Sequence, residues 1–232
     1  MGRLGNQLFQ AAATIGYARD NDKQYVFPRW SYSNYFELPI KEVDGKLIAE
    51  AWLRYTQFNY VDGDVNIHGH LLSEKYFAKH REHILNTFKL NDTHVDYIKD
   101  KYSDILSGNS CAIHVRRGDY LLPEQIVGQG IMPVSYYDKA KELVRADKYI
   151  VFSDDIEWCK ENIVADHYIE GEKDIIDMFM ISMCKNVIIS NSTFSWWGAW
   201  LNQMGGIVVA PRQWFVNTEG WDDLYRDEWI KI

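Results

Sequence analysis

The chain has 232 residues, of which 47% are hydrophobic, which is enough to bury one large core or two small ones and excludes a disordered chain. The formal net charge is −8, and it lies almost wholly in the second half: residues 1–107 hold 13 basic and 14 acidic side chains, and residues 108–232 hold 12 and 19. Neither half has the basic surplus typical of nucleic-acid-binding proteins, so no nucleic-acid partner is expected.

The first half has an irregular pattern. Leu8, Phe9, Ala12 and Ile15 have the spacing of one helix face. The elements expected in this half are helices over 6–19, 74–88 and 93–107, strands over 24–27 and 65–71, and an aromatic stretch without a clear period from Trp30 to Tyr60.

The second half alternates between strands and helices. Strands are expected over 110–115, 148–152, 187–190 and 207–210, with a weaker one at 167–169, and helices over 135–146, 156–163, 173–185 and 194–204. This alternation predicts a parallel sheet with helices on both faces, formed by right-handed crossovers. A Rossmann-like sheet of this kind binds its ligand beyond the carboxyl ends of the strands.

Cysteine and histidine positions favour neither a disulfide framework nor a metal site. The three cysteines are odd in number and lack metal-ligand spacing. The pairs His68/His70 and His80/His83 have no carboxylate at a spacing that would complete a site. No apolar stretch approaches the ~20 residues of a membrane span, and there is no signal-peptide pattern, so we expect a cytoplasmic protein, free or at the membrane periphery.

Three polar motifs fall at expected strand ends, and the first covers residues 114–120 (HVRRGDY). Two adjacent arginines that leave a buried strand are costly unless an anion or a carboxylate meets them. The guanidinium fork fits phosphate oxygens in a bidentate way, and Asp119 can hold one arginine in place or contact a substrate hydroxyl. Spacing alone leaves a phosphate site and a structural Arg–Asp ion-pair cluster equally open.

The other motifs follow later strands or open the chain. In Ser153-Asp154-Asp155, Asp155 suits a helix cap, and Asp154 is the better candidate to bind a cation, a ribose or the N1/N2 edge of guanine. Residues 190–198 (SNSTFSWWG) bridge a strand and a helix, where backbone N–H groups either bind an anion or are simply capped. The opening turn at residues 2–7 (GRLGNQ) fits neither a dinucleotide fingerprint nor a Walker loop.

Together, and in this order, the motifs resemble those of glycosyltransferase family 11, the α-1,2-fucosyltransferases. Residues 2–10 (GRLGNQLFQ) are similar to the family's N-terminal signature, residues 114–120 match its H-x-R-R-G-D motif, Asp154 lies in its S-D-D segment, and residues 190–202 (SNSTFSWWGAWLN) match its last motif. The resemblance implies an α/β fold of the GT-B type, in which two Rossmann-like domains face a cleft. The acceptor-side domain would cover 1–107 and the GDP-sugar-binding domain 108–232.

The resemblance also implies an activity and the residues that perform it. The family transfers L-fucose from GDP-fucose with inversion, α-1,2 to a galactose of a glycan, and requires no metal. Carried over, Arg116 would grip the β-phosphate with support from Arg117 and His114, and Asp154 would read the guanine. The base for the acceptor hydroxyl is not assigned, and Asp119 is the candidate. Ser192, Thr193 and Phe194 would cradle the diphosphate, and Asn6 would face the cleft near the donor phosphate or the acceptor.

Two features depart from the family pattern. A strand usually precedes the G-x-x-G-N-Q turn, whereas here only Met1 does, so either the start of the sequence is misassigned or the N-terminal sheet lacks its first strand. The chain is also short for the family. The alternatives are therefore a non-catalytic nucleotide-sugar or glycan-binding protein of the same fold, or a fucosyltransferase with another acceptor. The paired arginines and Asp154 favour an enzyme.

Overall fold

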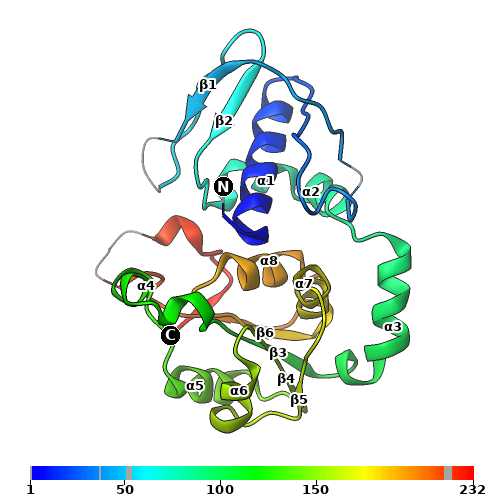
Figure 1. The fold of residues 1–232 in the computed structure, drawn as a ribbon, viewed down its shortest axis with the longest axis vertical. Coiled ribbons are helices and arrows are strands. Elements are labelled where there is room, and N and C mark those ends of the chain that lie inside the picture. The colour runs from blue at the N-terminus through cyan, green and yellow to red at the C-terminus, as the bar shows by residue number, and fades with distance from the viewer. Residues whose placement is uncertain (1, 37, 51–53, 217–220) are drawn as a thin grey trace. The chain divides into compact units, whose positions relative to one another are not determined.

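The computed structural model describes residues 2–36, 38–50, 54–216 and 221–232. The chain divides into two compact units. The N-terminal unit comprises Met1–Asp92 with Gly220–Arg226, and the C-terminal unit comprises Thr93–Glu219 with Asp227–Ile232. Figure 1 shows that each unit has its own parallel sheet. The acceptor and donor roles expected for the two halves of the chain stay predictions.

The N-terminal unit is built around helix α1 (Leu4–Asp20). The side chains whose spacing predicts this helix, Leu8, Phe9, Ala12 and Ile15, are all buried. Gly16 allows a close approach, because a Cβ at this position would lie 2.1 Å from the carbonyl oxygen of Tyr76. The helix predicted from the apolar spacing is confirmed.

The sheet of the N-terminal unit has two strands among the described residues, β1 (Lys46–Ala49) and β2 (Val65–His68), which pair in parallel. Of the strand expected over 24–27, only one bridge forms, between Phe27 and Ile40. The strand expected over 65–71 ends at His68, and Leu71, within the expected range, has a left-handed φ of 57° that a strand does not contain. The short helical elements of this unit are η1 (Glu74–Tyr76), η2 (Ala78–His80), α2 (Arg81–Thr87) and η4 (Asp222–Leu224).

The C-terminal unit contains a six-stranded sheet in which every pair of neighbours is parallel, as the alternating pattern predicts. Its strands in chain order are β3 (Ser110–Val115), β4 (Lys148–Ser153), β5 (His167–Tyr168), β6 (Asn186–Ile188), β7 (Val208–Ala210) and β8 (Ile230–Lys231). The spatial order β5-β4-β3-β6-β7-β8 corresponds to the order 3-2-1-4-5-6 of dinucleotide-binding folds. The edge strand β8 is short and has no counterpart in the sequence prediction.

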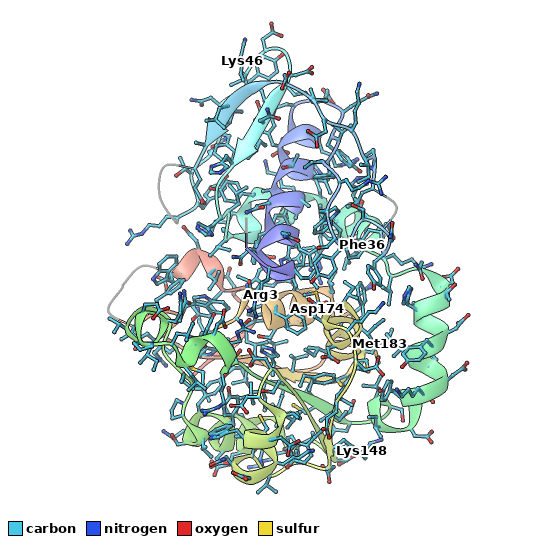
Figure 2. The ribbon with its side chains drawn as sticks, in the orientation of Figure 1. Arg3, Phe36, Lys46, Lys148, Asp174 and Met183 are labelled. Carbon is cyan, nitrogen blue, oxygen red and sulfur yellow. The ribbon has the colours of Figure 1, made fainter. Side chains whose placement is uncertain are left out.

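Helices cover both faces of this sheet. Figure 1 shows α5 (Val134–Val144) and α6 (Ile156–Asn162) on one face, and α7 (Asp174–Met183) and α8 (Thr193–Leu201) on the other. Two more helices, α3 (Asp92–Leu106) and α4 (Pro123–Gly128), precede β3 and follow it. Figure 2 marks α7 by its first and last residues, Asp174 and Met183.

The helices α7 and α8 supply much of the core. The tryptophans Trp196, Trp197 and Trp200 are fully buried, and their indole rings contact one another at centroid distances of 5.1 to 6.2 Å. They are therefore core residues rather than a sugar-stacking platform. Within the described residues, no helix is long and apolar enough to cross a membrane.

Candidate functional site

The carboxyl ends of β3, β4 and β6 carry the three motifs and lie side by side, because β3 pairs with β4 on one edge and with β6 on the other. The chain passes outward from β3 to β4 and β5, then returns to β6 on the opposite side of β3. Such a switch point opens a crevice beyond the strand ends, where α/β sheets bind ligands. The structure therefore brings the three motifs together at this edge.

An ion-pair cluster occupies the ends of β3 and β4. The two guanidinium nitrogens of Arg116 bind two different carboxylates: Nη1 lies 2.6 Å from Asp154 Oδ2, and Nη2 donates to Asp119 Oδ1. The backbone N–H of Arg117 donates to the other Asp154 oxygen at 2.9 Å, and its Nε lies 2.9 Å from Asp155 Oδ2. Both oxygens of Asp154 are thus engaged by protein groups.

Aromatic rings fix the planes of the two arginines. The Arg117 guanidinium lies 3.7 Å from the ring centroid of Trp158 on α6, and that of Arg116 lies 5.2 Å from the ring centroid of Tyr120. Both arginine side chains are only about 15% exposed, so these contacts are partly desolvated. The Tyr120 hydroxyl in turn donates to the carbonyl of Asn191 at 3.1 Å, which links the first motif to the last.

His114 is a buried, neutral residue at the switch point. Its Nδ1 lies 2.8 Å from Ser190 Oγ, and its ring lies 5.1 Å from the ring of Phe194. Burial, and secondarily the charge of Arg116, lower the pKa of His114 to about 3. At neutral pH it can therefore support a donor site by holding β3 to the β6–α8 loop, but it adds no positive charge.

We expect His114 to make stability depend on pH. The pKa of His114 is 6.5 in the unfolded chain and about 3 in the fold, so below pH 6.5 the unfolded chain binds a proton that the folded protein excludes. The contribution of His114 to the free energy of unfolding is therefore complete above pH 6.5 and is lost as the pH falls. The variant His114→Asn lacks this titration. The difference in unfolding free energy between wild type and variant should shrink by about 2 kcal/mol between about pH 6.5 and pH 5, as urea unfolding can measure. A difference that stays constant would contradict the assignment.

The last motif forms the loop between β6 and α8. Ser192 is the N-cap of α8, and its side chain makes no capping hydrogen bond to the helix. The first N–H groups of a helix have no partners within the helix, so the start of α8 at Thr193 and Phe194 can bind an anion. The fully buried Asn191 fixes this loop, because its Nδ2 donates to the carbonyls of Gln129, Gly130 and Trp214 at 2.6 to 3.2 Å.

The opening turn belongs to the N-terminal unit. Asn6 lies in the first turn of α1, and Gly2 packs so closely on it that a Cβ there would lie 2.4 Å from Asn6 Nδ2. Gln7 Nε2 donates to the Gly2 carbonyl at 2.9 Å, which closes the turn. The role of Asn6 at the donor phosphate or the acceptor stays a prediction, because the other candidate residues lie in the C-terminal unit.

Sequence reasoning does not single out three further residues. Gly118 is required by a close contact, since a Cβ there would lie 2.2 Å from Asp154 Oδ2. Trp158 packs on Arg117 from the next helix. Asp177, in the first turn of α7, has a buried Oδ1 without a hydrogen-bond partner. The otherwise apolar run KDIIDMFMISMCK contains two carboxylates, Asp174 and Asp177, and a carboxylate inside such a run is the one signal that could have identified Asp177.

Polar groups elsewhere belong to other arrangements. A cavity of about 540 Å³ lies in the N-terminal unit between α1, the start of β2 and the segments 23–28 and 41–44, and none of the predicted site residues line it. His80 and His83 contact Arg19, and His80 also pairs with Asp20. The described part of the chain contains no group of three or more histidine, cysteine or acidic residues arranged to hold a metal ion.

Comparison with known proteins identifies relatives of this chain. Residues 2–232 match the model of glycosyl transferase family 11. The O-antigen biosynthesis glycosyltransferase WbnK of Escherichia coli is 39% identical over 170 residues, which are 66% of this chain and 56% of the relative. An alpha-1,2-colitosyltransferase of Escherichia coli is 36% identical over 184 residues (73% and 63%), and the galactoside 2-alpha-L-fucosyltransferase Sec1 of Mus musculus is 26% identical over 271 residues (100% and 72%). The chain therefore spans 56 to 63% of the length of the two bacterial relatives.

Solved structures show the same fold at low sequence identity. The fucosyltransferase NodZ from Bradyrhizobium has a TM-score of 0.59 and 15% identity, with 84% of this chain and 88% of that chain covered. POFUT1 in complex with GDP-fucose has a TM-score of 0.52 and 12% identity, with 89% and 92% covered. The α/β fold of the GT-B type is thereby established, and the match over residues 2–232 shows that this chain belongs to glycosyltransferase family 11.

Proposed function

We propose that this chain is an inverting glycosyltransferase that moves L-fucose from GDP-fucose to a glycan hydroxyl, in α-1,2 linkage to galactose. The observation that carries the proposal is the position of Arg116 and Arg117 opposite the start of α8, at the switch point of a nucleotide-binding sheet. The names of family relatives, which include galactoside fucosyltransferases from mammals, support the sugar and the acceptor.

Arg116 can bind the β-phosphate without leaving its carboxylates. A guanidinium has five N–H donors, and the pairs with Asp119 and Asp154 require one donor from each Nη. Donors therefore remain for a phosphate oxygen. We assign Asp154 to the donor site through Arg116 and the Arg117 N–H, which it orients, and Arg117 to a supporting position beside it.

The diphosphate needs a second source of positive potential. The two arginines and the carboxylates of Asp119, Asp154 and Asp155 sum to a formal charge of −1. The remaining attraction comes from the N-terminus of α8, where the backbone around Ser192, Thr193 and Phe194 would hold phosphate oxygens. As GDP leaves, these fixed donors stabilise the charge that develops on it.

Asp119 is the candidate base for the acceptor hydroxyl. Its side chain is 37% exposed, against 27% for Asp154, and it shares Arg116 with that residue. Arg116 keeps its pair with Asp119 while its remaining donors bind the phosphate, so the Asp119 carboxylate is held in place when donor binding is complete. A carboxylate at this position can accept the proton of the attacking hydroxyl.

Turnover should need no divalent metal, because the carboxylates that would hold one are already paired with arginines, and the remaining donors of Arg116 together with the N-terminus of α8 supply positive potential for the diphosphate. The test is to incubate the purified chain with GDP-fucose and a panel of galactose-ended glycans, with and without EDTA, and to measure GDP release and product mass. We expect acceptor-dependent GDP release that EDTA leaves unchanged. Loss in EDTA with recovery in Mn²⁺ would instead make Asp154 and Asp155 metal ligands.

Two further candidates have distinct outcomes in the same assay. A colitosyl donor is favoured by the 36% identity to an alpha-1,2-colitosyltransferase, and it predicts faster turnover with GDP-colitose than with GDP-fucose. A non-catalytic binding protein predicts GDP-sugar binding without GDP release on any acceptor. The six-stranded parallel sheet and the arginine motif are expected for all three candidates, so the choice of donor and the release of GDP separate them.

A further inference from the structure

Tyr120 contacts both parts of the proposed phosphate site. It lies in the short helical turn η3 (Gly118–Leu121) that follows the two arginines. The centroid of its ring lies 5.2 Å from the guanidinium carbon of Arg116, and its hydroxyl donates to the Asn191 carbonyl at 3.1 Å. Arg116 follows β3, whereas Asn191 lies in the loop between β6 and α8. One side chain therefore connects the arginine that would grip the β-phosphate with the loop that begins α8.

Asn191 is a rigid anchor for this hydrogen bond. Its side chain is fully buried, and its Nδ2 donates to carbonyls of two other segments of the chain, at residues 129–130 and at Trp214, at 2.6 to 3.2 Å. A backbone hydrogen bond of 2.8 Å between the two residues that flank Asn191 closes a turn around it. Because this stretch of backbone is held from several sides, the Asn191 carbonyl offers the Tyr120 hydroxyl a fixed position.

The ion pairs of Arg116 orient it toward only one side of the site. Its partners Asp119 and Asp154 follow β3 and β4. The start of α8 follows β6, which lies on the opposite side of β3 from β4. The contact with Tyr120 connects the guanidinium to that opposite side, since the face of a tyrosine ring attracts a cation and the hydroxyl of the same ring is bound to the β6–α8 loop.

We propose that Tyr120 is a positioning residue for sugar transfer, which holds the Arg116 guanidinium at a fixed spacing from the start of α8 so that both contact the diphosphate together. The assignment rests on the proposed use of a GDP-sugar at this site. Donors that are already in place need no reorganisation when charge develops on the departing GDP. Loss of the hydrogen bond to Asn191 should therefore lower kcat more than it raises KM.

The test is the variant Tyr120→Phe, which keeps the ring and removes only the hydroxyl. With GDP-fucose and a galactose-ended glycan, we expect kcat to fall about 10-fold and KM for GDP-fucose to change by less than about threefold. Tyr136→Phe is the matched control. The Tyr136 hydroxyl donates to the carbonyls of Ile189 and Val209 at 2.6 and 3.3 Å, and its ring packs on Tyr137 in the core. This variant should lower the melting temperature and keep the kcat of wild type.

A double-mutant cycle with Arg116→Lys shows whether Tyr120 acts through Arg116. Tyr120→Phe should add little to the loss in Arg116→Lys, because the guanidinium that the ring orients is gone. If Tyr120→Phe kept the kcat of Tyr136→Phe, or if its loss were fully additive to that of Arg116→Lys, the inference would be overturned and the proposed function would stand. A wild-type chain that releases GDP from no GDP-sugar with any acceptor would instead refute the proposed function, and this assignment with it.

Discussion

Replacing Arg116 by lysine should be almost as damaging as replacing it by alanine, with kcat lowered about 10²- to 10³-fold in both variants. Lysine keeps the charge but loses the planar fork, and Arg116 uses two separate Nη atoms to reach Asp154 and Asp119 before any phosphate is bound. An ammonium group cannot hold two carboxylates and a phosphate in that geometry. Since much of the interaction strengthens as GDP leaves, kcat should fall more than KM rises.

The measurement must separate this effect from a loss of structure, because Arg116 also belongs to an ion-pair cluster. Thermal stability and donor turnover are measured on the same preparations. Arg212→Lys is the matched control, since Arg212 is an exposed arginine of the same unit whose side chain donates a hydrogen bond to the carbonyl of Lys231. If Arg116→Lys kept a turnover per folded molecule close to that of wild type, the ion-pair cluster would have only a structural role.

The architecture of the C-terminal unit could be predicted from sequence because one physical signal repeats along it. Short apolar strands alternate with amphipathic or buried helices, and only a parallel sheet with covered faces can bury all of them. The N-terminal unit lacks this signal. Its strands β1 and β2 have four residues each and are largely exposed or half-buried, so their sequences show no run of core residues. The bend at Leu71 depends on tertiary packing that no local pattern records.

The sequence predicts which residues form the site, but it does not predict which of them pair with one another. The motifs at the ends of β3, β4 and β6 identify Arg116, Asp154 and Ser192, because polar residues after buried strands must meet at one edge. Which carboxylate binds which guanidinium depends on strand order and loop path, so the engagement of both Asp154 oxygens could not be anticipated. Asp177 is not identified from the sequence for a similar reason. Its sequence context is that of a core helix, and only the packing of the described residues shows that its Oδ1 lacks a hydrogen-bond partner.

Gly118, the glycine of the arginine motif, should be as necessary for turnover as the charged side chains around it. In Gly118→Ala the new Cβ would lie 2.2 Å from Asp154 Oδ2, the oxygen that pairs with Arg116 Nη1. Gly118 does not have a left-handed φ, so alanine strains the carboxylate rather than the backbone. A displacement of about 1 Å at a positioning group can cost about 100-fold in rate, and we expect kcat/KM to fall by that order. Overpacking should lower stability by about 1–3 kcal/mol, which leaves the protein folded.

Gly128→Ala is the matched control for this prediction, because no atom of the described residues lies within 4 Å of the Cβ it would add at the end of α4, and it should keep wild-type turnover. A double-mutant cycle then locates the damage. If Gly118→Ala acts by pushing Asp154 away from Arg116, adding it to Asp154→Ala should cost little more than Asp154→Ala alone, since the carboxylate that meets the new methyl group is gone. Fully additive losses would place the effect of Gly118→Ala elsewhere and would show that Asp154 does not hold Arg116 for catalysis.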